Sequence, residues 1–197
     1  MNKKIARWAL CAAALPLALL AATGPQAAEP TPALQPLPEL KVPPYMGRWY
    51  QVALYPNVFQ RQCASDTTAE YRLLPGGEVE VTNRCRTAEG KFDQVVGVAR
   101  PIGRLDGDRL IPAQLEVSFL PAWLRWLPVG WGSYWVVRLA DDGRYAIVSE
   151  ASREYLWVLS RQPRLSAADE SAIRSMLVEL GFDLQKLQPH AQSAAGR

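Results

Sequence analysis

Hydrophobic and polar residues alternate in short runs along most of the chain. Turn residues such as Pro75-Gly76-Gly77 and Asp141-Asp142-Gly143 separate some of these runs. Alternating runs bounded by such residues are typical of β-strands joined in hairpins. The pattern predicts eight strands, over residues 49–55, 67–74, 78–85, 92–99, 115–120, 134–139, 145–149 and 155–160.

Eight short strands at even spacing favour a β-sandwich or a barrel. A closed antiparallel meander leaves no edge strand exposed, and it can enclose a cavity. One helix is expected after the last strand, because Ser166 is suited to cap it and Gly181 to end it. Its apolar stripe should pack against the outside of the sheet. The stripe consists of Ile173, Met176, Leu177 and Leu180.

The first 28 residues have the pattern of a secretory signal peptide. A basic start precedes an uncharged apolar run over 8–22, and Gln26-Ala27-Ala28 offers small residues near a cleavage point. The run is short for a membrane helix, and an uncleaved anchor is the alternative. Cys11 is not preceded by the small residues of a lipoprotein signal. We therefore expect an exported chain without a lipid anchor.

The mature chain is expected to have three parts. Residues 29–44 contain six prolines, which predict an extended leader without regular helix. Residues 45–189 hold the strands and the helix, and they are expected to form one domain. Residues 190–197 are small and polar, which predicts a flexible tail.

Removal of the signal peptide changes the charge of the chain. The full sequence has 22 Lys and Arg against 19 Asp and Glu. Loss of Lys3, Lys4 and Arg7 leaves 19 basic residues, so the mature chain is near neutral. The charge therefore gives no argument for nucleic-acid binding. The only histidine, His190, lies in the tail without spaced partner ligands, so no metal site is expected.

Two cysteines, Cys63 and Cys85, remain in the mature chain. In an oxidising compartment such a pair most often forms a disulfide, and two buried free thiols are the alternative. In a regular register across the hairpin at Gly76, the two cysteines miss each other by about four residues. A disulfide therefore requires the chain before the second strand to bend back, and it would stiffen that end of the fold.

Three motifs occur in a characteristic order. Gly47-Arg48-Trp49-Tyr50 opens the first strand, 145–149 follows a tight turn, and 155–161 ends the last strand before Gln162-Pro163. With eight strands and a following helix, this order resembles the lipocalin family, in particular its bacterial outer-membrane and apolipoprotein D-like members. The likeness covers roughly 44–189. It implies an all-β fold: an eight-stranded antiparallel up-and-down barrel with one C-terminal α-helix packed outside.

The resemblance also implies how one end of the barrel is closed. The start of the first strand and the end of the last strand meet at the same end of an eight-stranded meander. This places Trp49, after the turn at Gly47, beside Arg161. A guanidinium can stack on an indole and donate to nearby carbonyls. We expect these three residues to have a structural role rather than to contact a ligand.

Side-chain alternation predicts which residues face the barrel interior. If Trp49 points inward, Gln51 and Ala53 follow it. If Arg161 points to the closed end, Leu159, Trp157 and Tyr155 share its side, and the resemblance adds positions on the strands between. Large flat side chains suit an alkyl chain or a flat apolar ligand. The alternative is an interior filled by these side chains. The predicted ligand-binding residues are Ala53, Val117, Phe119, Tyr134, Val136, Tyr155 and Trp157.

The segment 120–131 is unusually rich in tryptophan for a loop. It should lie at the open end of the barrel, where Phe59 from the first loop is also expected. Tryptophan favours membrane interfaces, and Arg125 could meet a phosphate. We expect this loop to dock on a membrane or a partner, and a lid folded over the barrel is the alternative. The predicted docking residues are Phe59, Trp123, Arg125, Trp126 and Trp131.

The sequence contains no recognisable set of catalytic residues. A Ser-His-Asp triad needs a histidine within the fold, and the glycine pairs lack the lysine and helix of a phosphate loop. We therefore expect a binding protein without a cofactor, monomeric or weakly dimeric, in the periplasm or peripherally at the outer membrane. Its expected ligand is a fatty acid or a lysophospholipid, stored or transported in the cell envelope. The alternatives are a carrier of an isoprenoid quinone or a pigment, and a partner-binding protein with a filled barrel.

Overall fold

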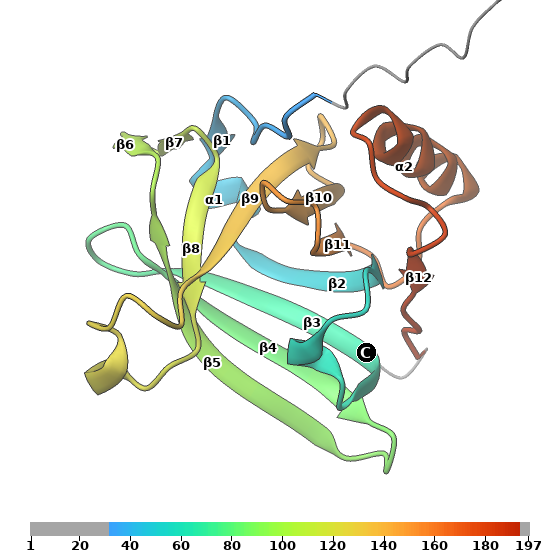
Figure 1. The fold of residues 1–197 in the computed structure, drawn as a ribbon, viewed down its shortest axis with the longest axis horizontal. Coiled ribbons are helices and arrows are strands. Elements are labelled where there is room, and N and C mark those ends of the chain that lie inside the picture. The colour runs from blue at the N-terminus through green and yellow to red at the C-terminus, as the bar shows by residue number, and fades with distance from the viewer. Residues whose placement is uncertain (1–31, 194–197) are drawn as a thin grey trace, which may run out of the picture. The chain divides into compact units, whose positions relative to one another are not determined.

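A computed structural model describes residues 32–193 of the chain (Figure 1). Within this range, eight antiparallel strands pair in sequence order, and the last pairs with the first to close a barrel. The predicted signal peptide lies outside the described residues. The barrel strands are β2 (Gly47–Leu54), β3 (Cys63–Leu73), β4 (Val79–Thr87), β5 (Phe92–Pro101), β8 (Gln114–Ser118), β9 (Gly132–Leu139), β10 (Tyr145–Ser149) and β11 (Leu156–Ser160).

The predicted eight-stranded barrel is confirmed, and each predicted range overlaps one barrel strand. The largest difference is in β3, which begins at Cys63 instead of at residue 67. Two irregularities of register, between Cys63 and Ser65 and between Ser65 and Thr68, allow the early part of β3 to stay paired with β4. Such bulges leave no trace in a simple alternating pattern.

The barrel has a closed end and a mouth, which different connections form. The start of β2, the turn at 74–78 and the segment 102–113 between β5 and β8 lie at the closed end. The mouth is formed by the connections over 55–62, 88–91, 119–131 and 150–155. The mouth connections include two short 3-10 helices, η1 (Val58–Gln60) and η2 (Ala122–Leu124).

A small second sheet and a helical turn lie at the closed end. The sheet has the order β1-β7-β6, and α1 (Val42–Tyr45) connects β1 to the barrel. The prediction that the prolines keep 29–44 free of helix is wrong at its end. Pro43 and Pro44 occupy the first turn of α1, where a missing amide hydrogen costs nothing. The small strands are β1 (Leu40–Lys41), β6 (Arg104–Asp106) and β7 (Arg109–Ile111).

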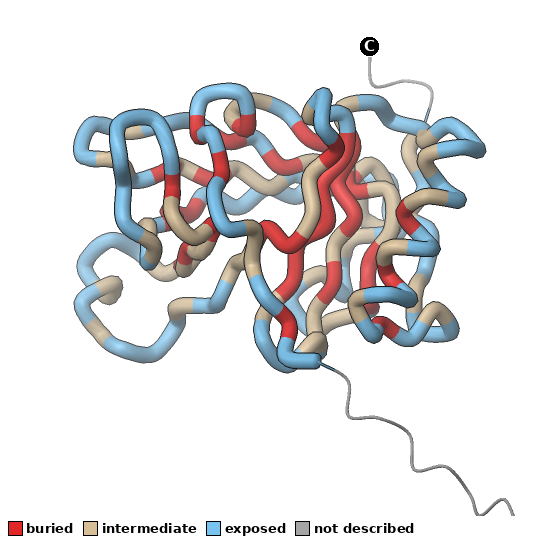
Figure 2. The backbone as a smooth tube through the Cα atoms, turned by 90° about the horizontal axis from the view of Figure 1, so that it is seen from above, coloured by how far each residue is buried: buried red, intermediate tan, exposed pale blue. Residues whose placement is uncertain are grey.

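The apolar side chains form two clusters, one inside the barrel and one beneath α2 (Ala167–Glu179). Figure 2 shows buried backbone concentrated on the strands, whereas the connecting loops are mostly exposed. Ser166 caps α2 by accepting a hydrogen bond from the Asp169 amide, as predicted, and Ile173 and Leu177 are buried against the sheet. The predicted packing of the helix on the outside of the barrel is confirmed.

The described part of the leader is attached to the barrel. Leu34 is buried in the cluster beneath α2. The Leu37 amide donates to the Val136 carbonyl oxygen, and the Leu37 carbonyl oxygen accepts from the Ala113 amide. The folded domain therefore begins before residue 45, the boundary that the prolines suggested.

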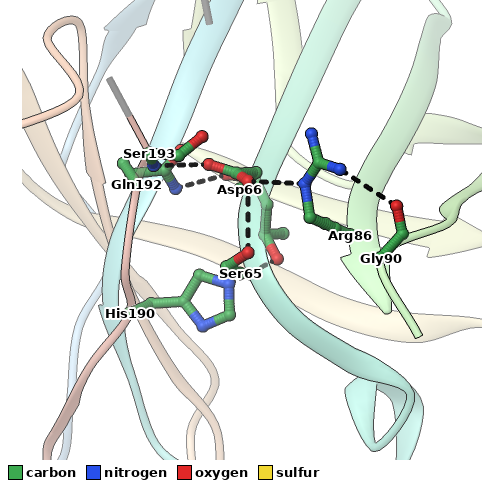
Figure 3. A network of polar contacts seen from close by, with 8 residues as sticks. Ser65, Asp66, Arg86, Gly90, His190, Gln192 and Ser193 are labelled. Atoms are coloured by element: carbon green, nitrogen blue, oxygen red, sulfur yellow. Dashed lines mark hydrogen bonds and ion pairs between the residues drawn. The ribbon is translucent and has the colours of Figure 1, made fainter. Parts of the chain in front are cut away.

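The C-terminal segment lies between the diverging parts of β2 and β3 (Figure 3). β2 pairs with β3 only from Gly47 to Tyr50. Beyond that point β12 (Gln188–Pro189) pairs with β2, and Gln192 Nε2 donates to carbonyl oxygens of both strands. The predicted flexible tail is therefore wrong for 190–193, because backbone groups left free by the two strands bind this segment.

The imidazole of His190 is part of this attachment. Its Nε2 lies 2.7 Å from the Thr67 hydroxyl, and burial lowers the pKa of His190, while the nearby Asp66 carboxylate opposes this shift. A lowered pKa means that the folded state favours the neutral ring. The attachment therefore contributes its full stability above the ordinary histidine pKa of about 6.5, and loses it as pH falls through the lower, folded-state value.

We expect acidification below about pH 6.5 to lower the melting temperature of the protein by a few degrees more than that of His190→Gln. Glutamine can still hydrogen-bond to Thr67 but does not titrate. Thermal unfolding monitored by circular dichroism over this pH range measures the difference. Identical pH profiles for the two proteins would show that His190 does not contribute to the acid sensitivity.

Candidate ligand cavity

Trp49 and Arg161 close one end of the barrel. Trp49 is fully buried, and its indole Nε1 donates to the Tyr45 carbonyl oxygen at 2.9 Å. The Arg161 guanidinium lies 3.7 Å from the centre of the indole ring. Arg161 also donates to the carbonyl oxygens of Arg48 and Pro44, each at 2.7 Å. These contacts are structural, because they bind strand β11 to the start of β2.

Gly47 begins β2 in a backbone conformation that favours glycine. Its φ is +83°, and a Cβ atom there would lie 3.9 Å from Nη1 of Arg161. The space is sufficient, so the requirement for glycine is conformational rather than steric. Gly47 thus turns the chain from α1 into the barrel and allows Trp49 to point inward.

A cavity of about 1100 Å³ lies inside the barrel. This volume is slightly above the usual range for small-molecule sites, about 300–1000 Å³. The interior is therefore not filled by side chains, contrary to the filled-barrel alternative. Most of its wall is apolar, with contributions from Val79, Val81, Ala99, Leu115, Val117 and Leu159.

Most of the predicted ligand-binding residues lie at this cavity. Its lining includes Val117, Phe119, Tyr134, Tyr155 and Trp157. Val136 is fully buried in the apolar cluster inside the barrel, where it packs rather than lines the cavity.

Ala53 faces away from the cavity, contrary to the prediction. Val158 pairs with Ala53, but the next residue of β11, Leu159, pairs with Gln51. Val52 is therefore an extra residue, and this bulge breaks the alternation on β2. Gln51 points inward as expected, whereas Ala53 packs in the cluster beneath α2.

A chain of side-chain hydrogen bonds crosses the mouth side of the cavity. Trp157 Nε1 donates to Gln60 Oε1 at 2.9 Å, and Gln60 Nε2 donates to Gln51 Oε1 at 2.8 Å. Because an indole nitrogen can only donate, this order fixes both amides and leaves Gln51 Nε2 as the free end. Within the described residues, Gln51 Nε2 is buried without a hydrogen-bond partner. Gln60 was not among the residues predicted from the sequence.

Three tyrosine hydroxyls meet deeper in the cavity. Tyr134 Oη lies 2.8 Å from Tyr45 Oη and 2.9 Å from Tyr71 Oη. Burial raises the pKa of all three, that of Tyr71 to about 12. All three phenols are therefore neutral at ordinary pH. Only Tyr134 was predicted, since Tyr45 lies between the proline-rich leader and the first predicted strand and the inward face of β3 was not assigned.

A disulfide joins Cys63 and Cys85 at the mouth, with their Cα atoms 5.5 Å apart. The free-thiol alternative is therefore wrong. The two irregularities in β3 pair Cys63 with Thr87, two residues from Cys85. The offset is thus smaller than the four residues of a regular register, and the strand itself supplies the expected bend.

The side chains of the tryptophan-rich loop differ in their exposure to solvent. Trp123 and Trp126 are 73% and 78% exposed, and Phe59, from the neighbouring loop, is 66% exposed. Arg125 instead donates to the Leu120 carbonyl oxygen, and Trp131 donates to the Arg125 carbonyl oxygen. Two of the three tryptophans of the loop, Trp123 and Trp126, therefore point into solvent.

Trp131 has a further packing role on the barrel wall. The guanidinium of Arg100 lies 3.9 Å from the centre of its indole ring. Arg125 and Trp131, both predicted to dock, therefore hold the loop in place. Of the predicted docking residues, Phe59, Trp123 and Trp126 remain exposed at the rim of the mouth, where Val58 and Val129 are exposed as well.

A family model described as a lipocalin-like domain matches residues 40–192. The chain belongs to the lipocalin family. Members of this family are generally binding or transport proteins for small hydrophobic ligands, which agrees with the cavity. Among the described residues, no helix is long and apolar enough to cross a membrane, and no cluster of potential metal ligands occurs.

Several curated proteins are similar to this lipocalin. Temperature-induced lipocalin-1 of Arabidopsis thaliana is 36% identical over 155 residues, 78% of this chain and 80% of that protein. Outer membrane lipoprotein Blc of Vibrio cholerae is 34% identical over 157 residues, 78% of this chain and 84% of that protein. Mouse apolipoprotein D is 28% identical, over 80% and 79% of the two chains.

The fold is also similar to that of solved lipocalin structures. Insecticyanin from Manduca sexta aligns with a TM-score of 0.63 at 19% identity, covering 83% of this chain and 87% of that chain. At this identity the likeness concerns the fold alone.

Proposed function

We propose that this lipocalin binds one lipid-like amphiphile, a fatty acid or a lysophospholipid, and stores or transports it in the cell envelope. The observation that carries the proposal is the cavity of about 1100 Å³ with a largely apolar wall and a few convergent polar groups. Burial of an alkyl chain in such a site contributes about 0.8 kcal/mol for each CH₂. A polar head can be held by the tyrosine hydroxyls or by the amide of Gln51.

A flat apolar molecule such as an isoprenoid quinone or a pigment is the second candidate. Tyr155 and Trp157 favour it, because their rings stack 5.9 Å apart and 10° from parallel on the cavity wall. A flat ligand could extend this stack, whereas an alkyl chain gains mainly from buried area.

Calorimetric titration of the delipidated protein tests the proposal. We expect saturable binding of one palmitate for each chain. Trp157→Ala should weaken the affinity about tenfold, which corresponds to about 1.4 kcal/mol. Trp126→Ala is the matched control, since this indole lies outside the cavity, and its affinity should be unchanged. Absence of binding by the unmodified protein, or equal affinities for all three proteins, would contradict the proposal.

We further propose that the protein is exported and contacts a membrane through the rim of its mouth. Two considerations support this. Relatives such as Blc are outer membrane lipoproteins by name, and the exposed Phe59, Trp123 and Trp126 stand on two neighbouring loops. Indole rings favour the interface between water and lipid. Contact at the mouth would let a lipid pass between bilayer and cavity without crossing water.

The double substitution Trp123→Ser and Trp126→Ser is expected to weaken liposome binding about tenfold, which corresponds to about 1.4 kcal/mol. Co-sedimentation with phospholipid vesicles measures the change. Val178→Ser is the control, because Val178 is an exposed apolar residue on α2, outside the mouth connections. Equal sedimentation of the double variant and the unmodified protein would show that the rim does not dock.

A further inference from the structure

The three tyrosines come from different elements and meet at one point of the cavity. Tyr45 belongs to α1, Tyr71 to β3 and Tyr134 to β9, and all three line the cavity. Tyr45 and Tyr71 are 4% and 7% exposed. The arrangement is supported by ring contacts, since Tyr45 stacks with Tyr71 at 5.7 Å and Tyr71 meets Tyr134 edge-on at 6.2 Å.

The tyrosine cluster has one hydrogen more than it can use. Three hydroxyls carry three hydrogens, but only two contacts join them, through Tyr134. If Tyr45 and Tyr71 both donate, the hydrogen of Tyr134 is unused. If Tyr134 donates to one of them, the hydrogen of that one is unused. Among the described residues these hydroxyls make no other hydrogen bond, so in every arrangement one hydroxyl hydrogen of the cluster has no protein acceptor and can be donated into the cavity.

Charges around the cavity are distributed unevenly. The Arg161 guanidinium lies on Trp49, and Trp49 lies 5.1 Å from Tyr45, so a cation stands behind the tyrosines at the closed end. The carboxylates that line the cavity lie at the mouth, on Asp93, Glu150 and Glu154. Arg84 lines it near the mouth too, but its Nε and Nη2 both donate to Gln94 Oε1. The deep end therefore favours oxygen acceptors over ammonium groups.

We propose that a single-chain amphiphile enters this cavity with its oxygen-bearing end first, and that this oxygen accepts the spare hydrogen of the tyrosine cluster. Its alkyl chain then runs along the apolar wall toward Trp157 and Phe119. The inference rests on the proposed function and narrows its ligand. It favours a free fatty acid over a lysophospholipid that has a phosphoethanolamine head. The ammonium group of that head is a hydrogen-bond donor, and the deep end of the cavity also offers donors.

The orientation can be measured with two stearic acids that carry a nitroxide, one near the carboxyl and one near the methyl end. A nitroxide broadens nearby proton signals, and the indole N–H signals of Trp49 and Trp157 report the deep end and the mouth side. The carboxyl-end label should broaden Trp49 most, and the methyl-end label should broaden Trp157 most. The reverse pattern would overturn the inference but not the proposed function. Absence of broadening with both labels would contradict the proposed function too.

Removal of the hydroxyls gives a second test. A single Tyr→Phe change leaves a spare hydrogen on the remaining pair, so all three tyrosines, Tyr45, Tyr71 and Tyr134, are replaced by phenylalanine. The affinity for stearic acid should fall about tenfold. Tyr145→Phe is the control, since Tyr145 is buried in the cluster beneath α2 and does not line the cavity, and its affinity should be unchanged. Equal affinity of the triple variant and the control would overturn the inference, and the nitroxide test stands if the triple variant does not fold.

Discussion

Replacement of Trp49 by alanine is expected to lower the free energy of unfolding by about 3–5 kcal/mol. The indole is fully buried at the closed end, and its loss leaves a cavity between Tyr45 and the barrel floor. The Arg161 guanidinium loses the ring on which it lies, and the Tyr45 carbonyl loses a hydrogen bond. In a domain of this size the melting temperature should fall by roughly 6–20 °C.

Trp126→Ala is the matched control for this change. Its indole is 78% exposed, so the same truncation should alter the free energy of unfolding by no more than about 0.5 kcal/mol. Urea denaturation followed by circular dichroism measures both variants. Equal losses in the two variants would show that the closed end does not hold the barrel together.

Replacement of both Cys63 and Cys85 by serine is expected to cost about 3 kcal/mol. The disulfide spans 22 residues of sequence and restricts the unfolded chain, so its removal increases the entropy of the unfolded state. The loss should appear as a lower denaturation midpoint. Strands β3 and β4 remain paired below the disulfide, so the barrel itself should still form.

The unmodified protein in a reducing buffer provides the control for the serine variant. Reduction removes the same bond without changing a side chain, so both samples should unfold at nearly the same midpoint. A serine variant as stable as the oxidised protein would show that the disulfide adds nothing to global stability.

The barrel strands were predictable because their alternation and turn residues act locally. Ser166 likewise marks the start of α2 by a local hydrogen bond to Asp169. The small strands β1, β6 and β7 have only two or three residues each, too few to show a period. The attachment of 190–193 also left no signal, because it depends on the divergence of β2 from β3, which pairing determines.

The candidate site was predictable where strands are regular. Alternation from Arg161 places Trp157 at the cavity, as observed, whereas alternation from Trp49 fails at Ala53 because of the bulge at Val52. Tyr45 could not be found in this way, since it enters the barrel from a helical turn that precedes the first predicted strand. A buried hydrogen-bond cluster unites residues from distant segments, and single-sequence patterns do not record such contacts.

The tryptophan-rich loop shows what composition can and cannot predict. Its apolar residues indicated a special surface, and Trp123 and Trp126 are indeed exposed. Composition could not separate them from Trp131, which packs against Arg100 on the barrel wall. Whether a tryptophan of this loop is exposed or packed depends on the side chains that lie next to it in the folded barrel.

We propose that the barrel interior holds one amphiphilic ligand. Native mass spectrometry of the protein purified from its own cells, followed by organic extraction and lipid analysis, tests it most directly. We expect one co-purifying lipid for each chain, released on extraction and identified as a single-chain amphiphile. A folded protein that carries no lipid, and does not take up fatty acid when it is supplied, would contradict the claim.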